Sequence, residues 1–197
     1  MTSLKPPAEI PIMPFKSKEK MVKWLEMHHS KSIGIWLKIS KKESNISSVT
    51  YPEAVEAALS YGWIDGQKKP FDNTYWLQKL TPRGQRSIWS KINCEKAELL
   101  IKEGKMRTAG LKEVERAKAD GRWNTAYESQ SKISVPEDLQ KALDKNPAAK
   151  SFFSTLNSIN RYAVLFRIHQ AKKTETRIAR IEKFVKMLEE NKTLHPG

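Results

Sequence analysis

Residues 62–93 concentrate aromatic rings and positive charge in one short stretch, which reads GWIDGQKKPFDNTYWLQKLTPRGQRSIWSKIN. The stretch holds three of the six tryptophans in the chain. Between residues 66 and 93, six Lys and Arg residues stand against Asp72 alone, a net charge of +5. Six cations with one acid cannot all be buried, because an unpaired buried charge costs several kcal/mol. The stretch therefore predicts either a β-hairpin whose rings fill the core while its lysines face water, or a concave site for an anionic ligand.

The length and composition of the chain predict a globular protein. A chain of 197 residues with 39% hydrophobic residues can form one domain, or a domain with a small appendage. Cys94 is the single cysteine, so no internal disulfide is expected, and we predict a cytoplasmic location. The N-terminal residues MTSLKPPAEIPIMPF contain four prolines and no unbroken apolar run, so we expect neither a signal peptide nor an anchor. No stretch of 18 apolar residues occurs, which predicts no membrane span.

The net charge of +14 is concentrated in two regions. Besides the first stretch, residues 161–186 carry eight cations and two acids, a net of +6. Such a surface is expected to attract an anionic ligand or an acidic partner, and nucleic acid is one candidate. We expect nucleic-acid binding to be weak, because the rings are expected to be too buried to stack on bases. The alternative is that the protein is simply soluble and positive. Oligomeric state cannot be predicted from these patterns.

The first two thirds of the chain predict an α+β domain over 17–130, preceded by an extended, Pro-rich arm over 1–16. Ser17 is expected to cap a helix that runs to about His29, and the β-branched run at 33–40 predicts a strand. Thr50 and Glu53 form a capping-box pattern for a second helix. That helix is expected to end at Gly62, where a positive φ costs little.

The tryptophan-rich stretch is expected to form a hairpin. Strands at 63–69 and 74–81, joined across the turn-forming residues PFDN, would make a small antiparallel sheet with 33–40. The alternative places the turn at Asp65-Gly66. After Pro82 the pattern becomes helical. Asn93 and Thr108 are then expected to cap two helices, which close at Gly104 and Gly121.

Residues 135–192 are predicted to form a separate helical unit after a polar linker. Ser134 to Glu137 repeats the capping pattern, and three helices with short connections would pack as a bundle. Two apolar stripes are expected to pack inward. They consist of Phe152, Phe153, Leu156, Ile159, Ala163 and Phe166, and of Ile178, Ile181, Val185 and Leu188, which Phe184 is expected to join. The whole chain is therefore predicted to be α+β: mostly helical, with a small antiparallel β-sheet, followed by a C-terminal helical bundle.

The sequence lacks the common fingerprints of catalysis. It contains no CxxC, HExxH, GxSxG, P-loop or GxGxxG after a strand, so we expect no metal and no cofactor. Cys94 follows a predicted helix start, where the helix dipole would lower its pKa and make it nucleophilic. Its alternative role is that of a small packed residue.

The residues that could hold an anion cluster around TPRGQRSIWSKIN, residues 81–93. Arg83 and Arg86 suit a bidentate grip on a carboxylate or phosphate. We expect a polar cleft in which one arginine faces an external anion. The candidate ligand-binding residues are Trp63, Asp65, Arg83, Arg86, Ser87, Trp89, Asn93 and Trp123, with the tryptophans as walls. In the alternative, the arginines only tie the hairpin to the helices through carboxylates such as Asp65, and the rings belong to the core.

Several blocks of the sequence carry a resemblance to a known family. They are GWIDGQKK, TPRGQRSIWSKIN, GKMRTAGL, AKADGRW, NRYAVLFRI and AKKTETRIARIEKFVKML. The chain resembles the bacterial YdeI/OmpD-associated family, also called bacteriocin-protection proteins, over about residues 13–192. The block at 135–192 is similar to the domain by which that family is recognised. The resemblance implies a cytosolic bacterial protein linked to protection against bacteriocins or to envelope stress, and it implies no reaction.

Two classes of function follow from these observations. The first is a non-enzymatic, stress-related protein in which residues 63–93 and the basic C-terminal helices hold an anionic ligand or partner. The second is an enzyme that acts on a small acidic substrate, with Asp65 as general acid or base and Arg83 and Arg86 orienting the substrate. A scaffold without a ligand is the third, simplest possibility.

Overall fold

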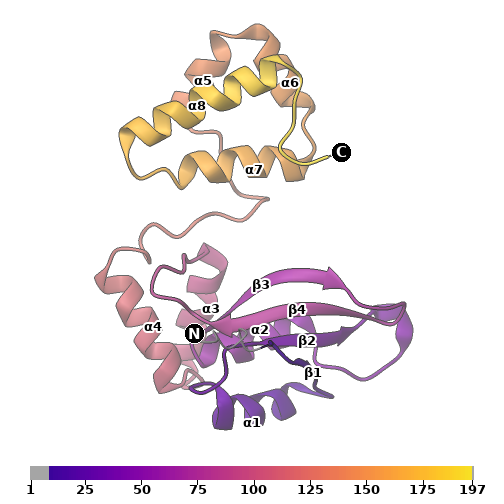
Figure 1. The fold of residues 1–197 in the computed structure, drawn as a ribbon. Helices are drawn as coiled ribbons and strands as arrows, with labels where there is room; N and C mark the ends of the chain where they lie inside the picture. Colours follow the sequence, from indigo (N-terminus) through magenta and orange to yellow (C-terminus); the bar gives the residue numbers. More distant parts are fainter. Residues whose placement is uncertain (1–8, 197) are drawn as a thin grey trace, which may run out of the picture. The chain divides into compact units, whose positions relative to one another are not determined.

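The computed structural model describes residues 9–196, which form two compact units. The first unit contains the chain up to Trp89 together with Asn93–Thr125, and the second contains Ser90–Ile92 and the chain from Ala126 onward (Figure 1). The α+β class is confirmed, because the first unit holds a β-sheet and the C-terminal part is helical. The expected domain bounds, 17–130 and 135–192, stay a prediction. Half of the expected arm, residues 1–8, lies outside the described residues.

The sheet of the first unit is mixed rather than purely antiparallel. Its strands are β1 (Ile12–Pro14), β2 (Ile35–Ser40), β3 (Trp63–Pro70) and β4 (Tyr75–Pro82), in the order β1-β2-β4-β3. β2 and β3 both pair antiparallel with β4, as the sequence predicts. β1 pairs parallel with β2, so part of the expected extended arm is a strand of the sheet. The strand forms because Phe15 is buried in the core, and because prolines are tolerated on an edge strand.

The turn of the β3–β4 hairpin lies where PFDN predicts it. The Asp72 carboxylate accepts hydrogen bonds from the backbone N–H groups of Thr74 and Tyr75, both at 2.7 Å. These bonds hold the pKa of Asp72 below its usual value, against the opposing effect of desolvation. Gly66 lies inside β3, so the alternative turn at Asp65-Gly66 is wrong. A β-bulge between Asp65 and Lys68 shifts the register there instead.

The helices of this part of the chain follow local signals, with two corrections. They are α1 (Lys18–His28), the short η1 (Lys42–Ser44), α2 (Tyr51–Ser60), α3 (Lys91–Lys102) and α4 (Thr108–Ala119). The capping box of Thr50 and Glu53 is present, and Gly62 has φ 74°. Asn93 lies inside the first turn of α3 instead of capping it, because the helix begins at Lys91. The N–H of Lys91 donates to the carbonyl of Tyr127. Thr108 is the first residue of α4 rather than its cap.

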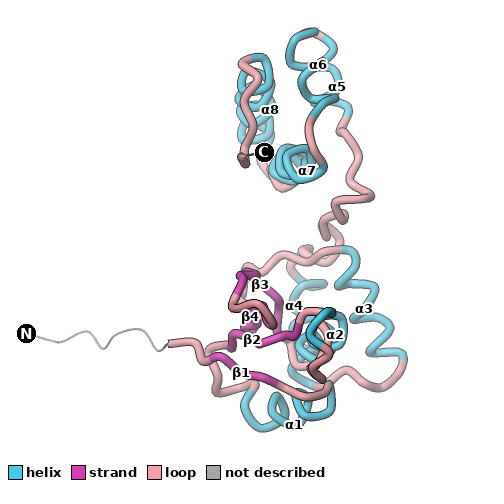
Figure 2. Tube along the Cα trace, turned by 90° about the vertical axis from the view of Figure 1, so that its right-hand side faces the viewer, coloured by secondary structure: helices cyan, strands magenta, loops and turns pink. Residues whose placement is uncertain are grey.

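The hydrophobic core of the first unit lies on one face of the sheet, here called the inner face. Met21 and Leu25 of α1 and three alanines of α2 pack there against Ile35, Leu37, Ile39 and Leu80 of the strands. Trp63 is fully buried in this core, and its indole N–H donates to the carbonyl of His29 at 3.2 Å. Figure 2 shows no described helix of the first unit on the opposite side of the sheet. We call that side the outer face.

The second unit is a helical bundle of α5 (Glu137–Asp144), α6 (Pro147–Thr155), α7 (Ser158–His169) and α8 (Thr174–Glu189). The predicted stripe from Phe152 to Phe166 is interrupted, because the Asn157 side chain accepts the N–H of Asn160 and starts a new helix. Ile159 is 60% exposed as a result. Along α8, Ile181, Phe184 and Leu188 are buried, and Val185 packs against them. Ile178 is 51% exposed, which corrects its assignment to the stripe.

Polar side chains fix the ends of this bundle. Arg177 donates to both oxygens of Asp138, at 2.5 and 2.9 Å, and also to the carbonyl of Ile168. The bonds from Arg177 hold the pKa of Asp138 below its usual value. Ser134 does not cap α5, which has Pro136 at its N-cap and no side-chain cap bond. None of the described helices is long and apolar enough to cross a membrane.

Candidate anion-binding site

Arg83, the first cation of the predicted cleft, is buried inside a loop. Its side chain is 6% exposed, and its guanidinium carbon lies 3.7 Å from the centre of the Trp89 ring. Its Nη1 donates to the carbonyl of Ile88 at 3.2 Å. Arg86, the second predicted cation, is exposed. The two arginines therefore have different environments, although the sequence predicts the same anion-binding chemistry for both.

The loop from Arg83 to Trp89 is held together by arginines that donate to its backbone carbonyls. Besides Arg83, Arg116 donates to the carbonyl of Gly84 at 3.1 Å, and Arg122 donates to that of Ser87 at 2.6 Å. The Ser87 hydroxyl accepts the N–H of Gly84 at 2.9 Å. Hydrogen bonds from charged donors are stronger than neutral ones, so these guanidinium groups stabilise the loop.

The structure brings some of the other predicted site residues together and separates the rest. Trp89 is fully buried, and its ring lies 4.9 Å from that of the half-buried Trp123. Trp63 belongs to the core around α1, where its ring contacts Trp24. Asn93 is half-buried on α3. That Trp63, Trp89 and Trp123 form the walls of one ligand cleft stays a prediction.

Asp65 has a partner other than the arginines. Its Oδ2 accepts a hydrogen bond from the Tyr51 hydroxyl at 2.7 Å. Within the described part of the chain, no hydrogen bond or ion pair joins Asp65 to Arg83 or Arg86. The expected Asp65–arginine contact, on which the purely structural hypothesis relied, is therefore absent there.

Cys94 is a packed residue. Its side chain is 8% exposed on α3, and burial raises the pKa of its thiol to about 11. The expected lowering by a helix dipole is wrong, because desolvation of the thiolate exceeds the opposing effect of Arg83. Among the described residues there is also no cluster of three or more metal-ligating side chains.

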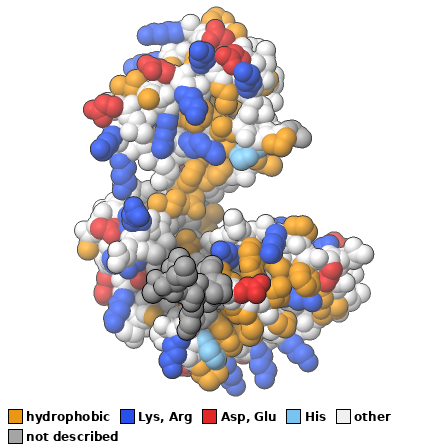
Figure 3. All heavy atoms as spheres, viewed as in Figure 1, with side chains coloured by type: hydrophobic (Ala, Val, Ile, Leu, Met, Phe, Trp, Pro, Cys, Tyr) orange, Lys and Arg blue, Asp and Glu red, His pale blue; other side chains and the backbone are white. Residues whose placement is uncertain are grey.

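Sequence reasoning missed an array of lysines and rings on the outer face of the sheet. The Lys69 ammonium lies 4.2 Å from the centre of the Trp36 ring, and the Lys79 ammonium lies 5.8 Å from it. Lys38 lies 4.0 Å from the Tyr75 ring and also contacts Phe71. Figure 3 shows hydrophobic side chains beside Lys and Arg side chains over this part of the molecule. Each exposed contact of this type contributes about 0.5–1 kcal/mol.

A cavity of about 580 Å³ lies at the end of the sheet near the hairpin turn, and Lys69 belongs both to its lining and to this array. Lys41 and Lys42 line one side, and Lys68 and Lys69 line another. Trp76 contributes a flat ring, over which the Lys68 ammonium lies at 4.6 Å. Glu43 is the one carboxylate in the lining. Four cations, one acid and an aromatic ring favour an anion that also carries a flat group.

The lysines of the outer face and of this cavity form no ion pair with a carboxylate among the described residues, although Lys38 and Lys41 are close enough to Asp72 to lower its pKa. Among the described residues, no carboxylate lies within ion-pair distance of Lys38, Lys68, Lys69 or Lys79, and the Lys41 ammonium donates to the carbonyl of Asp72 at 2.9 Å. An arriving anion would therefore have no internal ion pair to break. The alternation in IWLKIS and YWLQKL was the available signal, because it places a ring and a lysine on one face of each strand.

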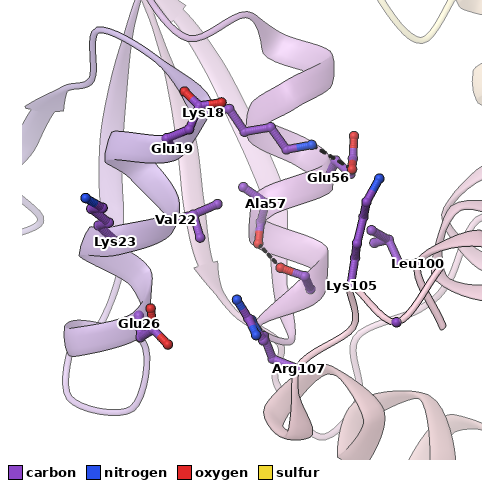
Figure 4. Close-up of a pocket in the computed structure, with 12 residues that line it drawn as sticks. Lys18, Glu19, Val22, Lys23, Glu26, Glu56, Ala57, Leu100, Lys105 and Arg107 are labelled. Carbon is purple, nitrogen blue, oxygen red and sulfur yellow. Dashed lines mark hydrogen bonds and ion pairs between the residues drawn. The ribbon is translucent and has the colours of Figure 1, made fainter.

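A second cavity, of about 520 Å³, lies between α1, α2 and the segment around Lys105 (Figure 4). Its charges are mixed: Lys18 pairs with Glu56 at 2.7 Å, and Glu19 and Glu26 line the same space. With cations and acids in nearly equal number, this cavity shows little preference for an anion. The lysine–ring array and its cavity are therefore the better candidate site.

The fold and site define an α+β unit with a lysine–aromatic sheet face, joined in one chain to a helical unit. Residues 13–113, just over half of the chain, match the family described as Domain of unknown function (DUF8412), and the chain belongs to that family. Residues 132–191 match the family described as Bacteriocin-protection, YdeI or OmpD-Associated, which confirms the resemblance for the helical unit. The expected extent, 13–192, is thus divided between two family models.

A relative with a similar segment is the Uncharacterized protein YdeI of Bacillus subtilis (strain 168). It is 36% identical to this chain over 62 residues, which cover 32% of each protein. The matched part therefore spans about a third of that relative's length. No solved structure matches the chain.

Proposed function

We propose that this chain is a non-enzymatic binding protein that holds an anionic partner on its first unit. The observation that supports the proposal is the set of lysines over aromatic rings around β2, β3 and β4. Lys38, Lys68, Lys69 and Lys79 have no carboxylate partner among the described residues. An anion that reaches them gains charge-assisted contacts and desolvates few internal groups.

The arginines of the 83–89 loop have a supporting role in this proposal. Arg83 is shielded and bonds a carbonyl of its own loop, so it anchors the segment that follows β4. Arg86 is exposed and adds to the positive field. The proposed contact with the anion therefore shifts from the predicted cleft to the lysines of the hairpin, which belong to the same charged stretch.

The test is binding of inorganic polyphosphate, a flexible polyanion without rings, followed by intrinsic tryptophan fluorescence. Trp36 and Trp76 lie under lysines, so displacement of these ammonium groups should change the emission. We expect binding that weakens as salt rises. Lys68→Gln with Lys69→Gln should weaken it, whereas Lys20→Gln, an exposed lysine on α1, should not. Absence of binding, or equal effects of the two sets of substitutions, would overturn the proposal.

We also propose a cytoplasmic location and a role in resistance to bacteriocins or related stress. The lone, buried Cys94 supports the location, and the description of the family matched by residues 132–191 supports the role. Fractionation of cells that express the protein tests the first. Survival of a deletion strain exposed to bacteriocin tests the second, and unchanged survival would count against it.

A further inference from the structure

The outer face of the sheet carries two ring–lysine groups at a fixed separation. The first is Trp36 with Lys69 and Lys79, and the second is Tyr75 with Lys38. Ser40 is the residue of β2 that pairs with Tyr75, and Trp36 lies four residues before it on the same face. Strands rise about 3.3 Å per residue and lie about 4.8 Å apart, so the two groups are roughly 14 Å apart.

The chemistry of each group is the same: a flat apolar surface with one or two cations beside it. A small inorganic anion would use the lysines and leave the rings unused. An acidic protein offers carboxylates and few flat groups, and a duplex keeps its bases stacked inside. A partner that alternates flat rings with negative charges along one chain matches both features.

We propose that the outer face binds single-stranded nucleic acid, with bases on Trp36 and Tyr75 and phosphates on the lysines. The inference rests on the proposed function, since it names the class of anion that the lysines hold. A stacked base interacts more strongly with a ring than an exposed lysine does, so a base can displace the ammonium from the ring. The flexible lysine stem then lets the ammonium reach a neighbouring phosphate.

The separation of the two ring–lysine groups sets the length of nucleic acid that can contact both of them. At the stacked rise of about 3.4 Å per nucleotide, roughly 14 Å corresponds to about four nucleotides. A dinucleotide therefore reaches one group and a longer strand reaches both. Because every base has a flat face, the strand is bound with little dependence on sequence.

The experiment measures fluorescence anisotropy of labelled 12-nucleotide single strands against the full chain, over a series of salt concentrations. For single strands the slope of log K against log salt is about −0.7 per phosphate contact. We expect Lys69→Gln to reduce that slope by about 0.7. Trp36→Leu should weaken binding by roughly 5- to 150-fold and leave the slope unchanged, because it removes stacking without removing a cation.

Two further variants test whether the weaker binding of Trp36→Leu comes from loss of the ring and not from loss of the fold. Trp36→Phe keeps a ring and should restore most of the affinity, and Tyr75→Leu should repeat the effect of Trp36→Leu at the other group. Lys20→Gln, on α1, is the control for general charge. Circular dichroism of each variant establishes that the fold is retained.

The outcomes separate this inference from the proposed function. If polyphosphate binds as tightly as the oligonucleotide and Trp36→Leu has no effect, the inference is wrong and the proposed function stands. Tighter binding of poly-glutamate than of the oligonucleotide would indicate an acidic protein instead and would also overturn it. If neither polyphosphate nor the oligonucleotide binds, both are wrong.

Discussion

Replacing Arg83 by alanine should destabilise the first unit, rather than merely remove a ligand contact. The guanidinium is 6% exposed, stacks on the buried Trp89 ring at 3.7 Å, and donates to the carbonyl of Ile88 at 3.2 Å. A hydrogen bond from a charged group contributes about 1.5–3 kcal/mol, and a shielded cation–ring contact contributes about 2 kcal/mol. The two overlap in one side chain, so we expect a loss of about 2–4 kcal/mol.

The assay is chemical and thermal unfolding of Arg83→Ala beside Arg86→Ala, followed by tryptophan fluorescence. A loss of this size lowers Tm by on the order of 10 °C in a unit of this length. Arg86 is exposed in the same loop, so its substitution should change stability by less than about 0.5 kcal/mol. An Arg83→Ala protein with unchanged Tm that no longer binds polyphosphate would refute the reasoning, and would make Arg83 a ligand residue.

Other predictions concern the second unit and Cys94. Phe184→Ala should lower the free energy of unfolding by about 3–5 kcal/mol, measured with denaturant, because Phe184 is 3% exposed. Ile178→Ala on the same helix should change it little. Equal losses would contradict the packing of α8. The pKa of Asp138 is lower in the folded protein than its ordinary value of 3.8. Its bonds with Arg177 therefore stabilise the fold fully above about pH 3.8, and this stabilisation is lost as the pH falls through the lower folded pKa. Asp138→Asn should therefore flatten the pH dependence of Tm below about pH 4, and an unaltered profile would count against the assignment. The Cys94 thiol, with its pKa raised to about 11, should react with a thiol reagent at pH 8 far more slowly in the native than in the unfolded protein, and equal rates would contradict its burial.

Local signals in the sequence predicted the elements whose stabilising contacts are local. The capping box of Thr50 and Glu53, the positive φ of Gly62 and the turn at Asp72 each depend on residues within a few positions of one another. Such patterns can be recognised without knowledge of the fold. They were enough to place the helix that ends before Gly62 and the hairpin turn, whereas the strand at 33–40 was predicted from its β-branched residues.

The features that sequence reasoning missed depend on contacts between distant segments. The parallel pairing of Ile12–Pro14 with β2 requires the position of Phe15 in the core. One partner of Arg83 is a backbone carbonyl, and side-chain patterns in the sequence do not reveal backbone carbonyl positions. Alternation along β2 and β4 places rings and lysines on one face of each strand, but which groups lie beside one another follows from the register that places Ser40 opposite Tyr75. The predicted candidate residues and the ring–lysine array therefore share part of the stretch 62–93, but the prediction emphasised its arginines and the array contains its lysines.

The three-residue strand β1 has a consequence for how the protein avoids pairing with its own copies. It covers the edge of β2, a strand with alternating buried apolar side chains, and the N–H of Trp36 donates to the carbonyl of Pro11 at 2.8 Å. An open edge of this kind recruits strands from other molecules, whereas prolines on an edge lack the N–H that a further strand needs. A shortened protein that begins at Ser17 would retain every helix of the first unit and still expose this edge. We therefore expect β1 to protect this edge from pairing with other molecules, and its removal should produce a protein that self-associates.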